Sequence, residues 1–170
     1  MEIELAGCRI RSWRREDAPA LSRHADSRKI WRNVRDHFPS PYTLPDADLW
    51  IERVLGGRPA TQFAIEVEGE AAGGIGVFLQ EDVARRSAEI GYWLGEAHWG
   101  RGIMTDAVRE FTSYALDAYG LLRLYAMVFE WNLGSCRVLE KAGYTLEGRL
   151  RRAVVKDGQV IDQFVYAVVR

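Results

Sequence analysis

Cysteine and histidine are scarce in this chain of 170 residues, which contains two cysteines and three histidines. Cys8 and Cys136 lie far apart and match neither a Cys-x-x-Cys redox motif nor the spacing of zinc ligands. His24, His37 and His98 are scattered along the chain. The sequence therefore predicts no metal site built from these residues and no disulfide framework.

Long apolar runs and an excess of one charge are also missing. No stretch approaches the roughly 18 apolar residues that indicate a membrane-spanning helix. The segment Met1–Leu5 lacks the basic start and apolar stretch of a signal peptide. Lys and Arg number 23 against 24 Asp and Glu, so the chain lacks the overall basic character of a non-specific nucleic-acid binder. We expect a cytoplasmic protein whose direct partners include neither a membrane nor nucleic acid.

Lysine is rare as well, occurring only at Lys29, Lys141 and Lys156, so arginine supplies most of the positive charge. Arginine favours bidentate recognition of phosphate and carboxylate groups, but a genome rich in arginine codons explains the same excess. Aromatic residues, by contrast, make up 11% of the chain. That fraction suits either a binding pocket or the interface of a homodimer.

Length and hydrophobic periodicity predict one mixed α/β domain over residues 1–170. Glycine-, proline- and asparagine-rich turns separate segments of strand and helix periodicity. Strands are expected at 4–13, 61–67, 72–79, 86–94, 122–129, 144–155 and 159–169. Helices are expected at 14–23, at 30–33, from Thr43 to the stop at Gly56-Gly57, at 101–119 and at 134–142. This order describes an antiparallel meander followed by a crossover.

The segment from His98 to Thr105 is the most informative, because it follows a predicted strand and opens the longest predicted helix. Backbone N–H groups at a helix N-terminus lack intrahelical partners, and the helix dipole adds positive potential there. Gly100 and Gly102 let an anion approach that backbone closely, which predicts a phosphate cradle. No Lys follows Gly102, as a P-loop requires, and Thr105 stands where a dinucleotide fingerprint has its third glycine. An ordinary tight turn is the alternative interpretation.

A second polar segment, from Asn132 to Tyr144, also lies where a predicted strand ends and a helix begins. Asparagine and serine favour helix N-termini, so plain capping is one interpretation of Asn132 and Ser135. In the other interpretation, both side chains project into a cleft between the two crossover strands.

Together these segments resemble the GNAT superfamily of acetyltransferases, in the branch similar to the RimJ and RimL protein N-terminal acetyltransferases. The resemblance covers nearly the whole chain, and the order and spacing of its pieces carry the specificity. These pieces are Arg9-Ile10-Arg11-Ser12-Trp13 with Asp17-Ala18, Phe38-Pro39-x-Pro41-Tyr42-Thr43 with Asp46-Ala47 and Trp50-Ile51, Glu89-Ile90-Gly91-Tyr92-Trp93-Leu94 with Trp99-Gly100-Arg101-Gly102, Asn132-x-x-Ser135 and Glu140-Lys141-x-Gly143-Tyr144 with Glu147-Gly148, and Asp157-Gly158 with Asp162. The resemblance implies a GNAT fold, in which a central, mostly antiparallel sheet carries helices on both faces and its two central strands splay into a cleft.

The resemblance also implies acetyl-CoA as the donor, with no metal. The backbone around Trp93 and Leu94 would pair with the pantetheine arm, and the glycine turn would hold the pyrophosphate. Asn132 would bond the pantetheine or an ordered water, and Ser135 would face the thioester sulfur. The residues implied to bind the cofactor are Trp93, Leu94, Trp99, Gly100, Arg101, Gly102, Ile103, Met104, Thr105, Asn132 and Ser135.

Two positions depart from the family pattern. Ala97 stands where many members carry Gln or Arg, which removes one side-chain contact to the cofactor. Leu139 stands where many members carry a tyrosine that acts as the acid, so this chain needs a different proton donor.

Direct transfer needs a neutral amine, a polarised carbonyl and a proton for the departing thiolate. An α-amino group has a reference pKa of about 7.7–8.0, against about 10.4 for lysine, so a modest base suffices. Glu89, which shares a strand face with Gly91 and Trp93, is the first candidate base, and a structural or solvent-facing glutamate is its alternative. Glu130 is the second candidate base. Ser135 is the candidate proton donor, with an N-cap of the last helix as its alternative.

The acceptor amine is expected across the cleft, near Asp36, Phe38 and Tyr42, where an acidic side chain suits a cationic group. A cluster of arginines would instead bind a carboxylate or phosphate, with ordinary solvated charge as the alternative. This cluster comprises Arg35, Arg149, Arg151 and Arg152.

Three functions fit these residues. The first is acetylation of the α-amine of a protein or peptide N-terminus. The second is acetylation of a small amine such as a polyamine, an aminoglycoside or an amino acid. The third is a non-catalytic, regulatory domain that binds an acyl-CoA. The complete glycine turn, together with Asn132 and Ser135, favours an enzyme.

Overall fold

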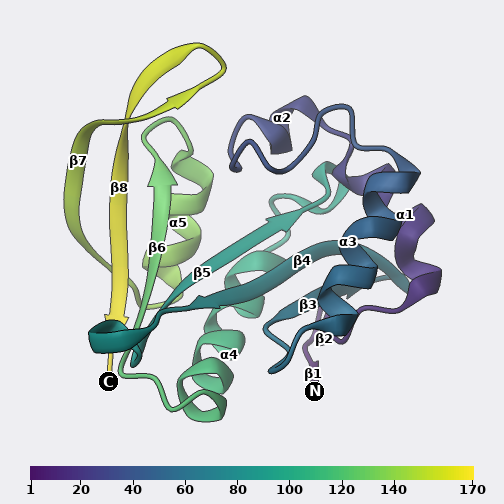
Figure 1. Cartoon of the computed structure of the whole chain (residues 1–170), viewed down its shortest axis with the longest axis horizontal. Helices are drawn as coiled ribbons and strands as arrows, with labels where there is room; N and C mark the ends of the chain where they lie inside the picture. Colours follow the sequence, from purple (N-terminus) through teal and green to yellow (C-terminus); the bar gives the residue numbers. More distant parts are fainter. The chain divides into compact units, whose positions relative to one another are not determined.

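The computed structural model describes residues 1–170, and its strands follow one another in the order β1-β2-β3-β4-β5-β6-β8-β7 in an eight-stranded sheet (Figure 1). β5 and β6 pair in parallel, whereas β1–β2, β2–β3, β3–β4, β6–β8 and β7–β8 pair antiparallel. The predicted fold class, a mixed α/β chain with a mostly antiparallel sheet, is therefore confirmed. The strands are β1 (Glu2–Glu4), β2 (Arg9–Arg11), β3 (Gln62–Val67), β4 (Glu70–Leu79), β5 (Ser87–Leu94), β6 (Arg123–Phe129), β7 (Thr145–Lys156) and β8 (Gln159–Val169).

The α-helices are α1 (Ala18–Ala25), α2 (Arg28–Trp31), α3 (Leu44–Gly56), α4 (Ile103–Ala118) and α5 (Leu133–Lys141). Three short 3-10 segments accompany them, namely η1 (Arg15–Asp17), η2 (Asp82–Ala84) and η3 (Glu96–His98). None of the helices is long and apolar enough to cross a membrane.

The N-terminal prediction is wrong in two respects. The strand expected at 4–13 is an antiparallel hairpin of β1 and β2, closed where the backbone N–H of Leu5 donates to the Cys8 carbonyl at 2.9 Å. The helix expected from residue 14 begins as a 3-10 turn and becomes α-helical only at Ala18. Pro19 lies in the first turn of α1, where its missing N–H costs no hydrogen bond.

Contacts divide the chain into two compact units, which are interleaved in sequence. The first unit comprises Met1–Gly76 and Tyr92–Ala107, and the second comprises Val77–Gly91 and Val108–Arg170.

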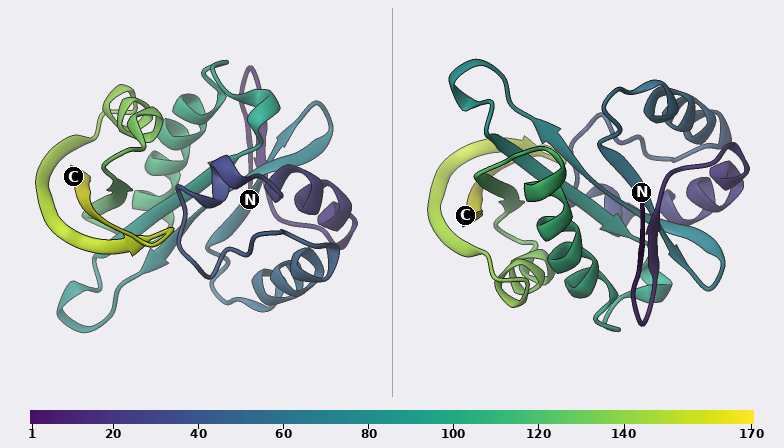
Figure 2. Two further views of the ribbon diagram at one scale, coloured as in Figure 1. Left: turned by 90° about the horizontal axis from the view of Figure 1, so that it is seen from above. Right: turned by 90° about the horizontal axis from the view of Figure 1, so that it is seen from below.

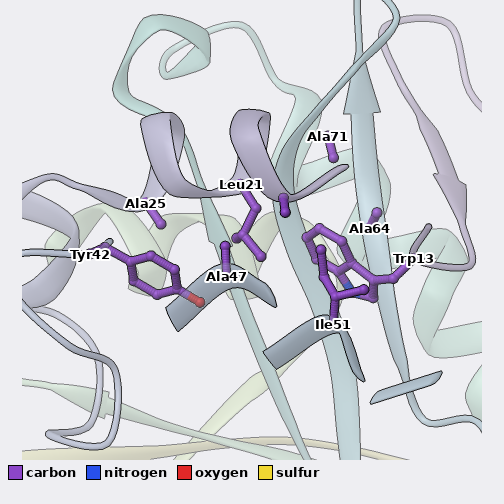
Figure 3. Packing of buried hydrophobic residues seen from close by; sticks show 9 residues of the cluster. Trp13, Leu21, Ala25, Tyr42, Ala47, Ile51, Ala64 and Ala71 are labelled. Atoms are coloured by element: carbon purple, nitrogen blue, oxygen red, sulfur yellow. The ribbon is translucent and has the colours of Figure 1, made fainter. Parts of the chain in front are cut away.

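The core of the first unit is a hydrophobic cluster between α1, α3, β3 and β4. Figure 3 shows Trp13 and Ile51 beside Ala64, with Tyr42 near Ala25 at the other end of the cluster. Small residues dominate it, so the helices approach the sheet closely. The remaining members are Ala18, Leu21, Ala47 and Ala71.

Helix α3 begins as its sequence predicts. Thr43 is its N-cap, accepting a hydrogen bond from the N–H of Asp46, while the Asp46 carboxylate accepts one from the N–H of Thr43. Such a reciprocal capping box satisfies two backbone donors that the helix itself leaves unpaired. Pro45 occupies the first turn, and α3 ends at Gly56.

In the second unit, β6, β8 and β7 form an antiparallel ladder that ends at the edge strand β7. The β7–β8 hairpin is strongly curved (Figure 2), and its turn places both Asp157 and Gly158 at positive φ, as a tight hairpin turn requires. β7 is exposed along most of its length, and its pairing with β8 shifts register twice, at Leu146/Gly148 and at Leu150/Val154.

The parallel ladder between β5 and β6 is short. Ser87–Glu89 pair with Arg123–Tyr125, and the ladder ends there although both strands continue. Over those later residues β6 remains paired with β8 as far as Phe129.

Candidate functional site

The predicted glycine turn lies in the first unit, between β5 and α4. Gly100 has φ 74° and Gly102 φ 81°, in the left-handed region that favours glycine. A Cβ added at either residue would meet no protein atom within 4 Å, so the backbone conformation rather than crowding selects glycine there. Both glycines are exposed, whereas the side chains of Ile103 and Met104 point into the core. The turn therefore presents backbone groups beside open space, as an anion cradle would.

Side chains hold this turn on two sides. The indole N–H of Trp99 donates to the Leu94 carbonyl at 2.7 Å, which ties the turn to the end of β5. The Arg101 guanidinium donates to His98 Nδ1 at 3.1 Å and to Glu68 Oε1 at 3.0 Å. Of these residues, His98 is buried with 8% exposure, and Trp99 is 46% exposed.

Three aromatic residues predicted to contact cofactor or acceptor come together in the first unit. The ring of Phe38 packs edge-on against Trp93 with centroids 5.8 Å apart, and lies 4.8 Å from the ring of Tyr42. Gly74 makes room for the Trp93 indole, because a Cβ there would lie 2.8 Å from its Nε1. Residues far apart in the sequence thus form one aromatic cluster at the end of β5.

The predicted acceptor residues differ in accessibility. Tyr42 is 6% exposed and belongs to the core cluster, and burial raises the pKa of its phenol to about 12, with a smaller effect from Asp46. Phe38 is half-buried, and Asp36 is exposed. Direct contact of these three side chains with an acceptor stays a prediction, and burial makes Tyr42 the least accessible of them.

In the second unit, the start of α5 shows which of the two residues, Asn132 or Ser135, caps this helix. Asn132 is the N-cap, and its Oδ1 accepts a hydrogen bond from the backbone N–H of Ser135 at 3.2 Å. The interpretation of Ser135 as the N-cap is therefore wrong, since that position belongs to Asn132. Asn132 uses its oxygen in the cap, which leaves its amide N–H groups to donate elsewhere.

The two candidate bases have different surroundings in the second unit. Glu89 is half-buried and pairs in register with Tyr125, at the last position of the β5–β6 ladder. Glu130 is held by the protein, because its Oε2 accepts from Arg149 at 3.1 Å and its Oε1 accepts from the backbone N–H of Asp162 at 3.0 Å. These bonds give Glu130 a structural role between β6 and β8.

The same network engages part of the arginine cluster. The Arg149 Nε donates to Asp162 at 2.5 Å, and the backbone N–H of Arg152 donates to the other Asp162 oxygen at 2.7 Å. The Arg152 N–H, followed by the Arg149 side chain, lowers the pKa of the Asp162 carboxyl below its ordinary value. Arg149 is thus committed to an ion-pair network within the second unit.

Sequence reasoning missed the side-chain cluster around His98. The His98 ring lies 5.5 Å from that of His24, whose Nε2 is 3.4 Å from Glu70 Oε2. The spacing of three residues between His98 and Arg101 is the signal that the sequence offered, whereas nothing in it points to Glu68 or His24. No group of three or more His, Cys, Asp or Glu side chains gathers as the ligands of a metal ion would.

A family model described as acetyltransferase (GNAT) domain matches residues 8–145 of the chain. The probable N-acetyltransferase YjcK of Bacillus subtilis is 48% identical over 85 residues, which are 50% of this chain and 47% of that protein. Ribosomal-protein-serine acetyltransferase of Escherichia coli is 32% identical over 64% of this chain and 60% of its own length. Spermidine N(1)-acetyltransferase of Escherichia coli is 26% identical over 89% of this chain and 80% of its own length. The matched part of this chain spans only about half the length of YjcK and of a second relative, the uncharacterized N-acetyltransferase YoaA of Bacillus subtilis, covering 47% and 48% of them.

Solved structures share the fold over almost the whole chain. RimJ of Mycobacterium smegmatis, in complex with a CoA-disulfide, has a TM-score of 0.84 at 27% identity, covering 95% of this chain and 81% of that one. RimL, a ribosomal α-N-protein acetyltransferase in complex with coenzyme A, has a TM-score of 0.87 at 22% identity, covering 99% and 98%. At that identity, the likeness to RimL supports the fold alone.

Proposed function

Because the chain belongs to the GNAT family of acetyltransferases, we propose that it transfers the acetyl group of acetyl-CoA to the α-amine of a protein or peptide N-terminus. The glycine turn before α4 carries this proposal. Its two left-handed glycines face open space at the N-terminal end of a 16-residue helix, where backbone N–H groups and the helix dipole favour an anion.

The residues proposed to hold the cofactor are those at the end of β5, in the glycine turn and at the start of α5. Backbone N–H groups of the turn would receive the pyrophosphate, since the buried side chains of Ile103 and Met104 cannot. The end of β5 at Trp93 and Leu94 offers backbone groups to the pantetheine arm. Asn132 would donate its amide N–H to the pantetheine or to a water, since its oxygen is used in the helix cap.

When bound, acetyl-CoA supplies the acetyl group as an activated thioester. Peptide N–H groups of β5 would polarise the carbonyl, as the donors of an oxyanion hole do. The Glu89 carboxylate would take the proton of the incoming amine, directly or through a water. Ser135 Oγ–H would give a proton to the thiolate, a role consistent with Leu139 standing where many members have tyrosine.

The acceptor would approach over the surface formed by Phe38 and Trp93, with the exposed Asp36 on the same loop to attract a cationic amine. An α-amine suits a mild base, because its reference pKa of about 7.7–8.0 leaves a sizeable neutral fraction at pH 7. Relatives named for ribosomal-protein serine acetylation support this acceptor.

Acetylation of a small amine is the second candidate function. The match to a spermidine acetyltransferase extends over 89% of this chain and favours it. A non-catalytic, regulatory domain that binds an acyl-CoA is the third candidate function, and it predicts binding of the acyl-CoA without turnover.

Release of free CoA across a panel of acceptors tests these proposals. The panel contains peptides with different N-terminal residues, N-terminally blocked copies of the same peptides, polyamines, aminoglycosides and amino acids. Turnover with free peptides and none with blocked ones would support the proposed acceptor, and turnover confined to small amines would replace it. Tight acetyl-CoA binding without thiol release from any amine would contradict the catalytic proposal.

Glu89→Gln tests the base. The expected result is a fall of about 100-fold in turnover at neutral pH, the usual range for loss of a general base, with CoA affinity nearly unchanged. Glu130→Gln is the control, because its carboxylate is bonded to Arg149 and Asp162; it is expected to lower thermal stability more than turnover. Wild-type turnover by Glu89→Gln at every pH would remove Glu89 from the mechanism.

A further inference from the structure

The glycine turn has a single side chain between its two left-handed residues. Gly100 and Gly102 lack a Cβ and populate both signs of φ, so the peptide groups that flank Arg101 are free to rotate unless something fixes them. Arg101 is fixed by two bonds, to His98 Nδ1 at 3.1 Å and to Glu68 Oε1 at 3.0 Å. Its guanidinium therefore anchors a backbone that its neighbours leave flexible.

The Arg101–His98 bond defines the state of the imidazole. A guanidinium only donates hydrogen bonds, so Nδ1 of His98 must accept, and the neutral ring carries its proton on Nε2. Protonation of His98 would turn Nδ1 into a donor, break this bond and place two cations side by side. The bond from Arg101 to His98 thus exists only with neutral His98, whereas the bond to Glu68 does not depend on this ring.

We infer that His98 is a positioning residue for the cofactor turn, holding Arg101 jointly with Glu68 so that the turn's backbone N–H groups are set for a pyrophosphate. This inference rests on the proposed binding of CoA at the turn. His98 touches Arg101 and acts through it, without contacting the cofactor itself.

The surroundings of His98 favour the neutral ring at pH 7. Burial lowers its pKa below the ordinary value of about 6.5, and the nearby His24 acts in the same direction. Arg101 also lowers this pKa, whereas Glu68 and Glu70 raise it. Because Glu70 is bonded to Arg23 at 2.6 Å and approaches His24, its charge is shared with two other groups.

The lowered pKa of His98 sets the direction of the pH effect on CoA binding. His98 is neutral at pH 7, and it takes up a proton as the pH falls through its lowered pKa, which leaves Arg101 held by Glu68 alone. CoA affinity should then fall on the acid side of neutrality by more than titration of the CoA phosphates alone produces.

The experiment measures CoA binding by calorimetry at pH of about 7.5 and about 5.5 for the wild type, His98→Asn and His98→Leu. Asparagine keeps an acceptor near the position of Nδ1 and does not titrate in this range, so His98→Asn should bind like the wild type at the higher pH. Between the two pH values the wild type should lose more affinity than His98→Asn, by at most about tenfold, because only the fraction of His98 that is protonated at the lower pH weakens binding. His98→Leu should bind about tenfold more weakly already at the higher pH.

His37→Asn is the matched control, because it makes the same substitution at an exposed loop position and should keep the wild-type pH profile. Thermal melting verifies that each variant is folded. If His98→Leu does not fold, the pH profile of His98→Asn decides alone. A wild-type pH profile in His98→Asn, or wild-type affinity in a folded His98→Leu, would overturn the inference while leaving CoA binding intact. Absence of CoA binding by the wild type at both pH values would overturn the proposed function and the inference with it.

Discussion

Two helices of this molecule begin in opposite ways. At the start of α5, the Asn132 side chain accepts a hydrogen bond from a backbone N–H of the first turn. At the start of α4, the residue before the helix is Gly102, which has no side chain to perform that task. The N-cap side chain of α5 thus satisfies part of its own helix N-terminus, whereas Gly102 has no side chain to offer α4. The comparison indicates that an anion site at a helix start depends on the absence of a capping side chain as much as on the presence of backbone N–H groups.

Helix α3 has the most extensive side-chain cap of the three helices compared. There Thr43 and Asp46 satisfy each other's backbone N–H groups, and nothing is left for a ligand at those positions. Cap side chains thus satisfy two backbone N–H groups at α3 and one at α5, and Gly102 provides no side chain at α4.

Among substitutions at these three helix starts, replacing Gly102 by valine should have the largest effect on CoA affinity. A β-branched residue at φ 81° is strained by about 1–3 kcal/mol, and its side chain would occupy the open space where the anion is proposed to bind. CoA affinity, measured by calorimetry, is expected to fall about 100-fold. Gly120→Val is the matched control, because Gly120 also has positive φ and open space but lies past the far end of α4. Equal losses of CoA affinity in both variants would place the anion elsewhere.

Asn132 offers a smaller and more discriminating test. Asn132→Ala should lower the free energy of unfolding by about 1 kcal/mol, the usual loss for an N-cap, together with CoA affinity. Asn132→Asp keeps the capping oxygen but loses the amide N–H donors. We expect it to restore the stability, measured by urea denaturation, without restoring CoA affinity. Recovery of both properties by Asp would show that Asn132 serves only as a cap.

The smallest effect is expected at the capping box of α3. Hydrogen bonds from the Thr43 hydroxyl and N–H lower the pKa of the Asp46 carboxyl. Its stabilisation is therefore fully present above the unfolded pKa of about 3.9 and is lost as the pH falls through the lower folded value. Denaturation curves for Asp46→Asn should differ from the wild type at neutral pH and converge with it in acid. Asp48→Asn, in the same helix but outside the capping box, is the control and should keep the wild-type stability at neutral pH.

Local signals made much of the fold predictable. Thr43, Pro45, Asp46 and Gly56 delimited α3, because capping and turn chemistry act over a few residues. The β1–β2 hairpin was not predictable in the same way, since Arg9-Ile10-Arg11 reads as part of a longer alternating strand and the intervening turn has a weak signature. The parallel pairing of β5 and β6, by contrast, agrees with the predicted crossover, because a helix joining two neighbouring strands brings them together in parallel.

In the candidate site too, features that depend on local sequence were predictable and features that depend on contacts between distant segments were not. The two glycines and the cap residue at α5 were visible, because each acts through its own backbone. The packing of Phe38 on Trp93 and the bonds that hold Glu130 were not, because they depend on how separate elements meet. A cytoplasmic location, a homodimer and a single domain over residues 1–170 stay predictions.

The irregular edge strand β7 has a consequence for how this protein behaves at high concentration. A long exposed edge presents unpaired backbone groups that can recruit a strand from another chain and seed aggregation. In β7 the two register shifts, and the positive φ of Arg152, interrupt the straight edge that such recruitment requires. Arg151 and Arg152 are exposed along it, so a second copy aligned edge to edge would meet like charges. Part of the arginine excess is thereby placed where it opposes self-association into fibres.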